Sequence, residues 1–246
     1  EDITSYPFPD PHAPGRFDQA KKAVDKFGRE YAIVAELETT IWETSWYLVG
    51  LEKLMVDLMM EEPYVEALFN QVMEINLEIG KTLIGLGADI IWAGDDFGSQ
   101  QGMLMDPDTW RRYFKPRIKY LFEEWKKVNP EIKIAWHSCG SIIPIIDDFI
   151  EIGLDILNPL QPLAHHMDAE NLTQTFGKRL NYFGGIDIQE LLPQGPPERI
   201  KSEINRIAGI YGKHGGYILA PAHNIQDDTP VEHILAMFEA VKNLTD

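Results

Sequence analysis

The segment His137-Ser138-Cys139-Gly140 places an imidazole and a thiol two residues apart. If this segment ends a β-strand, Ser138 points to the opposite face and the side chains of His137 and Cys139 face the same way. Imidazole nitrogen and thiolate sulfur are both zinc ligands, and a Zn²⁺ held by three protein groups keeps one position open for a substrate. The alternative for these two residues alone is a buried cysteine beside a surface histidine.

His223 is the candidate for a third ligand. It follows an apolar run and precedes the segment Asp227-Asp228-Thr229-Pro230, which is typical of a capped helix start. A single histidine at a strand end is more often a hydrogen-bonded part of the scaffold. Together with His137 and Cys139, however, it completes a three-ligand zinc set, and we predict Zn²⁺ as the cofactor.

Two adjacent carboxylates, Asp95 and Asp96, are the candidate catalytic residues. Such a pair can divide into an ionised and a protonated member, or one carboxylate can orient a ligand histidine while the other contacts substrate. The alternative is helix capping and hydrogen bonding within a loop. Other polar side chains that follow expected strands are candidate substrate contacts, namely Gln100, Gln101, Asn158, Gln161, Asp187 and Asn224.

These residues need a scaffold that brings several strand ends together. Short β-rich apolar runs alternate with longer amphipathic runs, which is the pattern of βα units and a parallel sheet. The expected strands are 31–37, 89–93, 132–137, 155–160, 181–184 and 216–220, and the expected helices are 46–60, 63–86, 107–128, 142–152, 197–211 and 230–244. In a parallel barrel all the carboxyl ends of the strands share one face, where active sites lie.

The fold class predicted from this pattern is α/β, a distorted (β/α)8 TIM barrel. A doubly wound open sheet also collects residues at its strand ends, but no G-x-G-x-x-G sequence follows the first strand. Six strands are visible where a closed barrel has eight, so we expect either two hidden strands or a missing N-terminal portion. We predict one domain over residues 1–246, of which residues 1–20, with their proline-rich start, are a surface connector.

The amino-acid composition limits the kinds of partner and the cellular location that we expect for the chain. The formal net charge is −17, which disfavours nucleic acid because phosphate backbones are bound by surplus Lys and Arg. No uncharged apolar run approaches the roughly 20 residues that a membrane span needs, and the first residues do not resemble a signal peptide. Cys139 is the only cysteine, so no disulfide forms within the chain and a cytoplasmic location is expected.

The motifs together resemble the uroporphyrinogen decarboxylase superfamily, which includes cobalamin-dependent methyltransferases. The resemblance covers nearly the whole chain and is carried by Gly94-Asp95-Asp96-Phe97-Gly98-Ser99-Gln100, residues 107–116, His137-Ser138-Cys139-Gly140, Gly184-Gly185-Ile186-Asp187 and Pro221-Ala222-His223-Asn224. It implies a distorted (β/α)8 barrel. Decarboxylases of the family also carry an N-terminal segment with an R-x-x-G-R pattern for porphyrin carboxylates, which this sequence lacks, so the chain resembles a member without its N-terminal strands.

Within this superfamily His-x-Cys resembles the zinc motif of the methyltransferase branch. The third ligand there is commonly Cys, whereas His223 stands at the matching position and a histidine also occurs there in decarboxylases. The resemblance implies methyl transfer between a small methoxy, hydroxy or thiol substrate and a corrinoid (cobalamin) on a partner protein. The alternatives are metal-free uroporphyrinogen decarboxylation in porphyrin biosynthesis, and a non-catalytic zinc- or corrinoid-binding barrel. Open sheet edges would favour a homo-oligomer.

Overall fold

The computed structural model describes residues 3–245 of the chain. Two compact units make up the chain. The first comprises Glu1–Asp96, Met105–His137 and Glu151–Leu154, and the second comprises Phe97–Leu104, Ser138–Ile150 and Asp155–Asp246.

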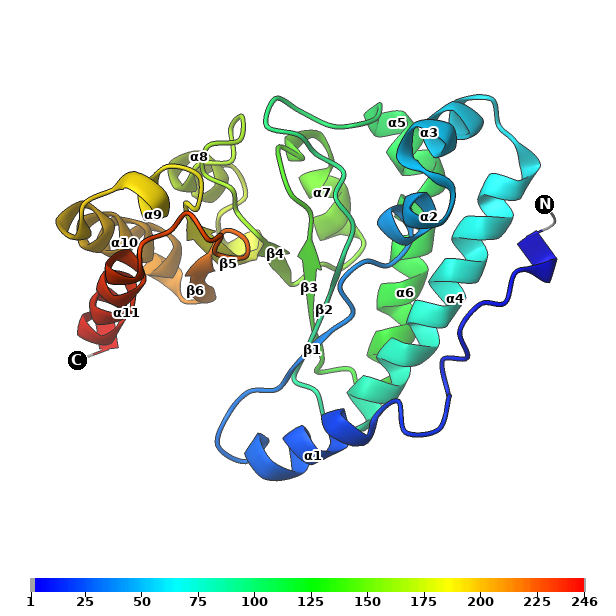
Figure 1. Ribbon diagram of the computed structural model, residues 1–246, viewed down its shortest axis with the longest axis horizontal. Helices are drawn as coiled ribbons and strands as arrows, with labels where there is room; N and C mark the ends of the chain where they lie inside the picture. The colour runs from blue at the N-terminus through cyan, green and yellow to red at the C-terminus, as the bar shows by residue number, and fades with distance from the viewer. Residues whose placement is uncertain (1–2, 246) are drawn as a thin grey trace. The chain divides into compact units, whose positions relative to one another are not determined.

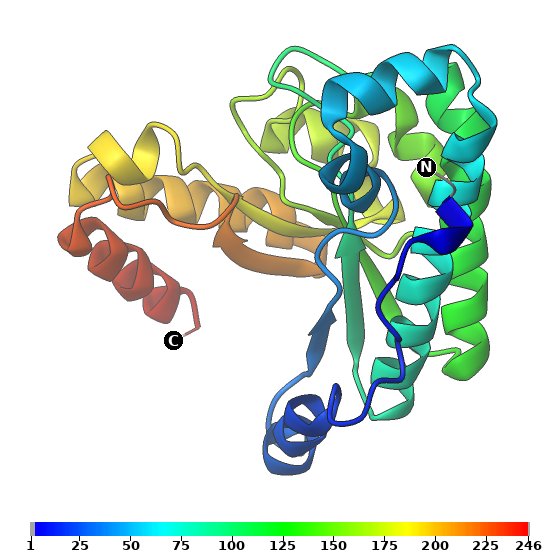
Figure 2. The same cartoon turned by 45° about the vertical axis from the view of Figure 1, so that its right-hand side comes forward.

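The first unit is built on three parallel strands in sequence order, β1 (Val34–Glu36), β2 (Ile90–Gly94) and β3 (Lys133–His137). Its helices are α1 (Asp18–Phe27), α2 (Trp42–Val49), α3 (Leu51–Met59), α4 (Pro63–Gly85), α5 (Pro107–Tyr113) and α6 (Lys115–Val128). The long helices α4 and α6 lie side by side (Figures 1 and 2). Trp125 of α6 is fully buried there, and its indole N–H donates to the carbonyl of Leu77 on α4 at 3.3 Å.

The second unit contains β4 (Ile156–Asn158), β5 (Asn181–Ile186) and β6 (Tyr217–Pro221), again parallel and in sequence order. Its helices are α7 (Ile143–Glu151), α8 (Ala169–Thr175), α9 (Leu191–Gln194), α10 (Pro197–Tyr211) and α11 (Val231–Thr245). The 3-10 turns of the chain are Ile3–Ser5, Gly177–Arg179 and Gly212–His214. Isoleucines one turn apart on α10, such as Ile200 and Ile204, bury its apolar face.

All six strands expected from the sequence are present, and each is followed by at least one helix. Two expected helices are interrupted. The helix expected over 46–60 begins earlier and breaks at Gly50, which has a φ of 90° and donates its N–H to the carbonyl of Trp46. The helix expected over 107–128 is divided at Phe114, two residues before Pro116, which has no N–H to continue the hydrogen-bond ladder. The sequence analysis missed α1, α8 and the short helix α9.

Among the residues that the structure describes, no helix has both the length and the apolar character needed to cross a bilayer.

Candidate metal and active site

Ser138 fixes the orientation of the His-x-Cys segment at the end of β3. Its side chain is fully buried, its hydroxyl accepts the Phe97 N–H at 3.0 Å, and its own N–H donates to the carbonyl of Asn158 at 2.9 Å. His137 and Cys139, on either side, are both partly exposed. Because Ser138 is held inward, its two neighbours present their side chains together, as strand alternation predicts.

Glycines allow the close backbone approaches around this segment. Gly94, the last residue of β2, pairs with His137, and a Cβ atom at position 94 would lie 2.3 Å from the His137 carbonyl oxygen. Gly140 has a φ of 76°, and a Cβ there would lie 2.5 Å from the Gly98 carbonyl carbon. A larger residue at either position would push apart the loops that carry the polar side chains.

His137, Cys139 and His223 form a group with the donors of a metal site. Each offers one ligand atom, and the three atoms all lie within 4.8 Å of one another. Only Ser138 separates the first two residues in the chain, while the third follows β6. Tetrahedral zinc holds such ligands at bond lengths that put them roughly 3.5 Å apart. The two imidazoles and the thiol therefore fit Zn²⁺ after a modest closure of their side chains.

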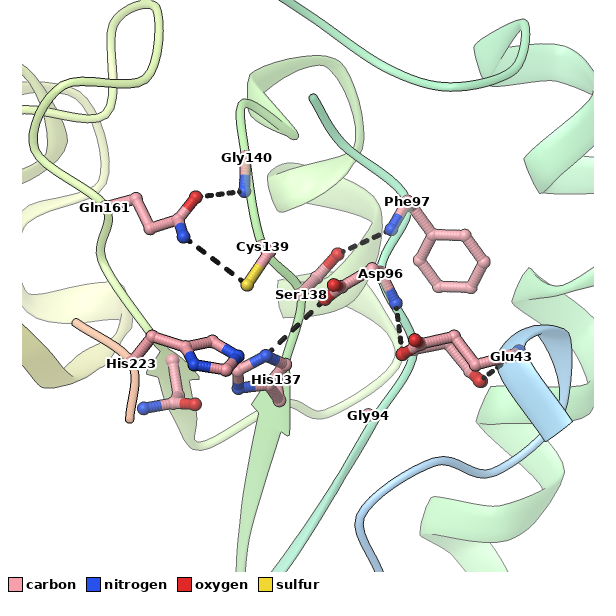
Figure 3. A network of polar contacts seen from close by, with 12 residues as sticks. Glu43, Gly94, Asp96, Phe97, His137, Ser138, Cys139, Gly140, Gln161 and His223 are labelled. Atoms are coloured by element: carbon pink, nitrogen blue, oxygen red, sulfur yellow. Dashed lines mark hydrogen bonds and ion pairs between the residues drawn. The ribbon is translucent and has the colours of Figure 1, made fainter. Parts of the chain in front are cut away.

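Gln161 orients an N–H group toward the sulfur of Cys139 (Figure 3). Its side-chain oxygen accepts the Gly140 N–H at 2.7 Å and a side-chain N–H of Gln100 at 3.3 Å. With the oxygen fixed in this way, the amide nitrogen of Gln161 faces Cys139 Sγ at 3.5 Å. A donor in that position stabilises a thiolate more than a thiol, because hydrogen bonds to a charged form favour that form.

His223 is exposed, and its Nδ1 atom accepts the N–H of Asn224 at 2.8 Å. This hydrogen bond leaves the proton of a neutral ring on Nε2. Ligation through Nδ1 would replace it. Asn224 is therefore next to the ligand group, and its carbonyl accepts a side-chain N–H from Gln226 at 2.9 Å.

Asp96 connects the ligand group to helix α2. Its carboxylate lies 3.5 Å from His137 Nε2, and its main-chain N–H donates to Glu43 Oε2 at 3.0 Å (Figure 3). A carboxylate that holds a ligand histidine fixes the orientation and tautomer of the ring and raises its basicity. This contact is the one that the orienting role predicted for one of the two aspartates requires, and the role itself stays a prediction.

Asp95 is used differently from its neighbour. Its carboxylate is fully buried and accepts the Ile41 N–H at 2.9 Å, the Glu43 N–H at 2.9 Å and the Thr40 hydroxyl at 2.7 Å. These bonds satisfy the first N–H groups of α2, the work of a helix cap supplied by a distant residue. Burial raises the pKa of Asp95 to about 6, against the hydrogen bonds, which lower it. Its catalytic role stays a prediction, and its observed contacts are structural.

Three of the predicted substrate contacts have other neighbours. Asn158 is buried and donates its side-chain N–H to the Phe183 carbonyl at 3.1 Å. Asp187 is also buried, and its carboxylate accepts the main-chain N–H groups that lead into α9. Gln101 is exposed in a loop and donates its main-chain N–H to the Ser99 hydroxyl at 3.4 Å. Gln100, Gln161 and Asn224 lie close to the ligand group or to a residue of it, and the substrate-binding roles of all six residues stay predictions.

Glu43 was missed by the sequence analysis. It lies in the first turn of α2, is 8% exposed, and accepts the Asp96 N–H on one oxygen and the Tyr47 hydroxyl at 3.2 Å on the other. Burial, followed by the charges of Asp96 and Asp95, raises the pKa of Glu43 to about 7. The available signal was the pair Thr40 and Glu43, which has the T-x-x-E spacing typical of a helix start.

The chain is built of parallel βα units, with the His-x-Cys segment at the end of one strand and a further histidine after another strand. These features define an α/β chain of barrel type with a candidate metal site. The chain belongs to the uroporphyrinogen decarboxylase (URO-D) family, whose model matches residues 1–244. This confirms the family suggested by the motifs.

Similar proteins carry two different names. The chain is 26% identical over 189 residues to the uroporphyrinogen decarboxylase of Carboxydothermus hydrogenoformans, covering 76% of this chain and 50% of that protein. It is 22% identical over 231 residues to the methylated-thiol–coenzyme M methyltransferase of Methanosarcina mazei, covering 93% and 59%. The chain thus spans about half the length of the curated relatives it matches.

A solved structure described as a methyltransferase from Methanosarcina mazei has the same fold. It matches with a TM-score of 0.73 at 23% identity, covering 94% of this chain and 64% of that one. The prediction of a distorted TIM barrel, present here with six parallel strands, is confirmed by this match.

Proposed function

We propose that this chain is part of a zinc-dependent methyltransferase that moves a methyl group between a small methoxy, hydroxy or thiol substrate and a corrinoid on a partner protein. The observation that carries the proposal is the group of two imidazoles and one thiol, whose ligand atoms lie within 4.8 Å of one another. The Methanosarcina mazei relative, named as a methylated-thiol methyltransferase, supports this class of reaction.

His137, Cys139 and His223 would hold the zinc ion. A bound Zn²⁺ supplies Lewis acidity toward a substrate oxygen, or keeps a substrate thiol in the thiolate form at neutral pH. Three protein ligands would leave a position open for that substrate, as in catalytic rather than structural zinc sites.

The surrounding residues have separate tasks. Gln161, fixed by Gly140 and Gln100, donates toward Cys139 and so stabilises the sulfur as an anion. Asp96 lies against His137 and keeps the ring turned toward the other ligands. These contacts prepare the donor set before any ion binds, which reduces the cost of ordering the site.

The second candidate function is uroporphyrinogen decarboxylation, and metal binding distinguishes it from the proposed methyl transfer. It is supported by sequence identity, because several relatives named as decarboxylases are 26–29% identical over about two thirds of the chain or more, against 22% for the methyltransferase. Metal-free decarboxylation needs cationic groups for the carboxylates of a tetrapyrrole.

Metal analysis of the purified chain tests the proposal. We expect about one zinc per chain, lost on Cys139→Ser and on His223→Ala. His165→Ala is the matched control for His223→Ala, since His165 is also an exposed histidine of the second unit but lies outside the ligand group. This variant should retain the metal. Zinc that binds equally to the Cys139→Ser protein, or no zinc after zinc-replete purification, would contradict the proposed site.

A turnover assay separates catalysis from binding alone. The chain, with zinc, is mixed with methylcob(III)alamin and a series of small thiols, and the loss of the methyl–cobalt absorbance is followed. Methyl transfer that stops with Cys139→Ser supports the proposed enzyme. A protein that binds zinc but transfers no methyl group to any of the thiols, and takes none from methoxy donors, would instead be a non-catalytic zinc-binding barrel.

A further inference from the structure

A buried carboxyl group, Glu43, lies one residue beyond the proposed ligand set and has no part in the mechanism above. It is attached to the site through the main chain of Asp96, whose N–H it accepts at 3.0 Å, and the carboxylate of Asp96 lies 3.5 Å from His137 Nε2. A continuous series of contacts therefore runs from Glu43 through Asp96 to His137 within the first unit (Figure 3).

We propose that Glu43 is a positioning residue for the metal site, which holds Asp96 against His137 and exchanges a proton with solvent through the hydroxyl of Tyr47. This inference rests on the proposed function for its metal, but the contacts that carry it do not. Glu43 acts through Asp96 and does not itself touch the ligand group in these contacts.

The geometry gives Glu43 both an anchor and an outlet. One carboxyl oxygen accepts the Asp96 N–H, and the other accepts the Tyr47 hydroxyl at 3.2 Å. Glu43 is 8% exposed and Tyr47 is 59% exposed, so the hydroxyl group of Tyr47 connects a buried carboxyl group to water. A proton that leaves Glu43 passes to the Tyr47 oxygen as the hydroxyl proton leaves to water, and uptake is the reverse, so no other reactant is needed.

The charges around Glu43 favour a bound proton. Its titratable neighbours are Tyr47 on the same helix, and Asp95 and Asp96 from the segment after β2. The adjoining helix α4 contributes the neutral Asn76, which donates to the Thr40 carbonyl at 2.8 Å. Two buried acids, Glu43 and Asp95, thus lie near the partly exposed Asp96, and repulsion from both aspartates adds to burial in raising the pKa of Glu43 to about 7.

The consequence is a change of charge beside the site at neutral pH. With Glu43 protonated, Asp96 keeps its place but experiences less repulsion. With Glu43 ionised, an additional negative charge lies behind the carboxylate that orients His137. Glu43→Gln keeps an oxygen for the Asp96 N–H but cannot ionise, and Glu43→Ala removes the oxygen, so the two variants separate positioning from protonation.

The first experiment needs neither metal nor turnover. The amide proton of Asp96 donates to Glu43, so its NMR shift follows the ionisation of that carboxyl group. In the zinc-free full chain we expect this amide to titrate with a midpoint near pH 7, as the raised pKa predicts, and to lose that step in Glu43→Gln. Glu52→Gln, which changes an exposed acid on the neighbouring helix α3, should leave the step unchanged. An Asp96 amide without a step between pH 6 and 8 overturns the proton exchange.

The second experiment measures zinc dissociation constants by competition with a chelator. Glu43→Ala should weaken zinc binding by about 10-fold, the lower end of the range for groups that contact a ligand directly, because Glu43 acts one contact further away. Glu43→Gln should restore most of the affinity. Equal affinity in wild type and Glu43→Ala overturns the positioning role. A wild-type chain that binds no zinc contradicts the proposed function, and the Asp96 amide titration then still decides the proton exchange.

Discussion

The raised pKa of Glu43 predicts how the stability of this protein depends on pH. Folding raises that pKa from its ordinary value of 4.5 to about 7, so between these pH values the folded chain binds more protons than the unfolded chain. The contribution of Glu43 to stability is therefore fully present below about pH 4.5 and is lost as the pH rises through 7. The shift, at 1.36 kcal/mol for each unit, corresponds to about 3 kcal/mol.

Replacement of Glu43 by Gln should remove this part of the pH dependence. The measurement is urea unfolding of the zinc-free protein at pH 5 and pH 8. The loss of unfolding free energy between the two should be smaller in Glu43→Gln than in wild type by about 2.5 kcal/mol, because part of the contribution is already lost at pH 5. For a chain of this size that corresponds to roughly 5–10 °C in the difference of melting temperatures. Glu52→Gln is the control for removal of one negative charge from an exposed position.

A pH dependence that is the same in wild type and in Glu43→Gln, to within about 1 kcal/mol, would refute the reasoning. It would mean that Glu43 is ionised in the folded protein across this range. Burial next to Asp95 and Asp96 would then be offset by the hydrogen bonds from Asp96 and Tyr47, which lower the pKa.

Two further predictions concern Asp95 and Gln161. Asp95→Ala removes the acceptor of the Ile41 and Glu43 N–H groups and should lower the free energy of unfolding in urea by about 3–5 kcal/mol. Asp95→Asn keeps one oxygen and should lower it by less. A decrease below about 1 kcal/mol for Asp95→Ala would show that the cap is dispensable. Gln161→Ala removes the N–H directed at Cys139 and should weaken zinc binding by about 10-fold or more with little change in unfolding of the zinc-free protein. Gln101→Ala is its matched control, and identical zinc dissociation constants for the two variants would contradict the role of Gln161.

The separate roles of the two adjacent aspartates could not be obtained from the sequence. Asp95 and Asp96 are identical in type and follow the same strand, so local pattern treats them alike. In the structure Asp95 points to the N–H groups at the start of α2, more than 50 positions earlier in the chain, and Asp96 points to His137. Only the tertiary packing of α2 against the end of β2 decides which of the two carboxylates caps the helix.

What the sequence by itself determined was the set of strands and the residues at their ends. Apolar runs of strand length locate β1 to β6, and side-chain alternation already places His137 and Cys139 on one face, because both signals are local. The position of His223 near them, the buried carboxyl group of Glu43 and the fixed amide of Gln161 depend on contacts between distant segments. Burial and long-range charge set these properties, and neither is encoded in residue type or spacing.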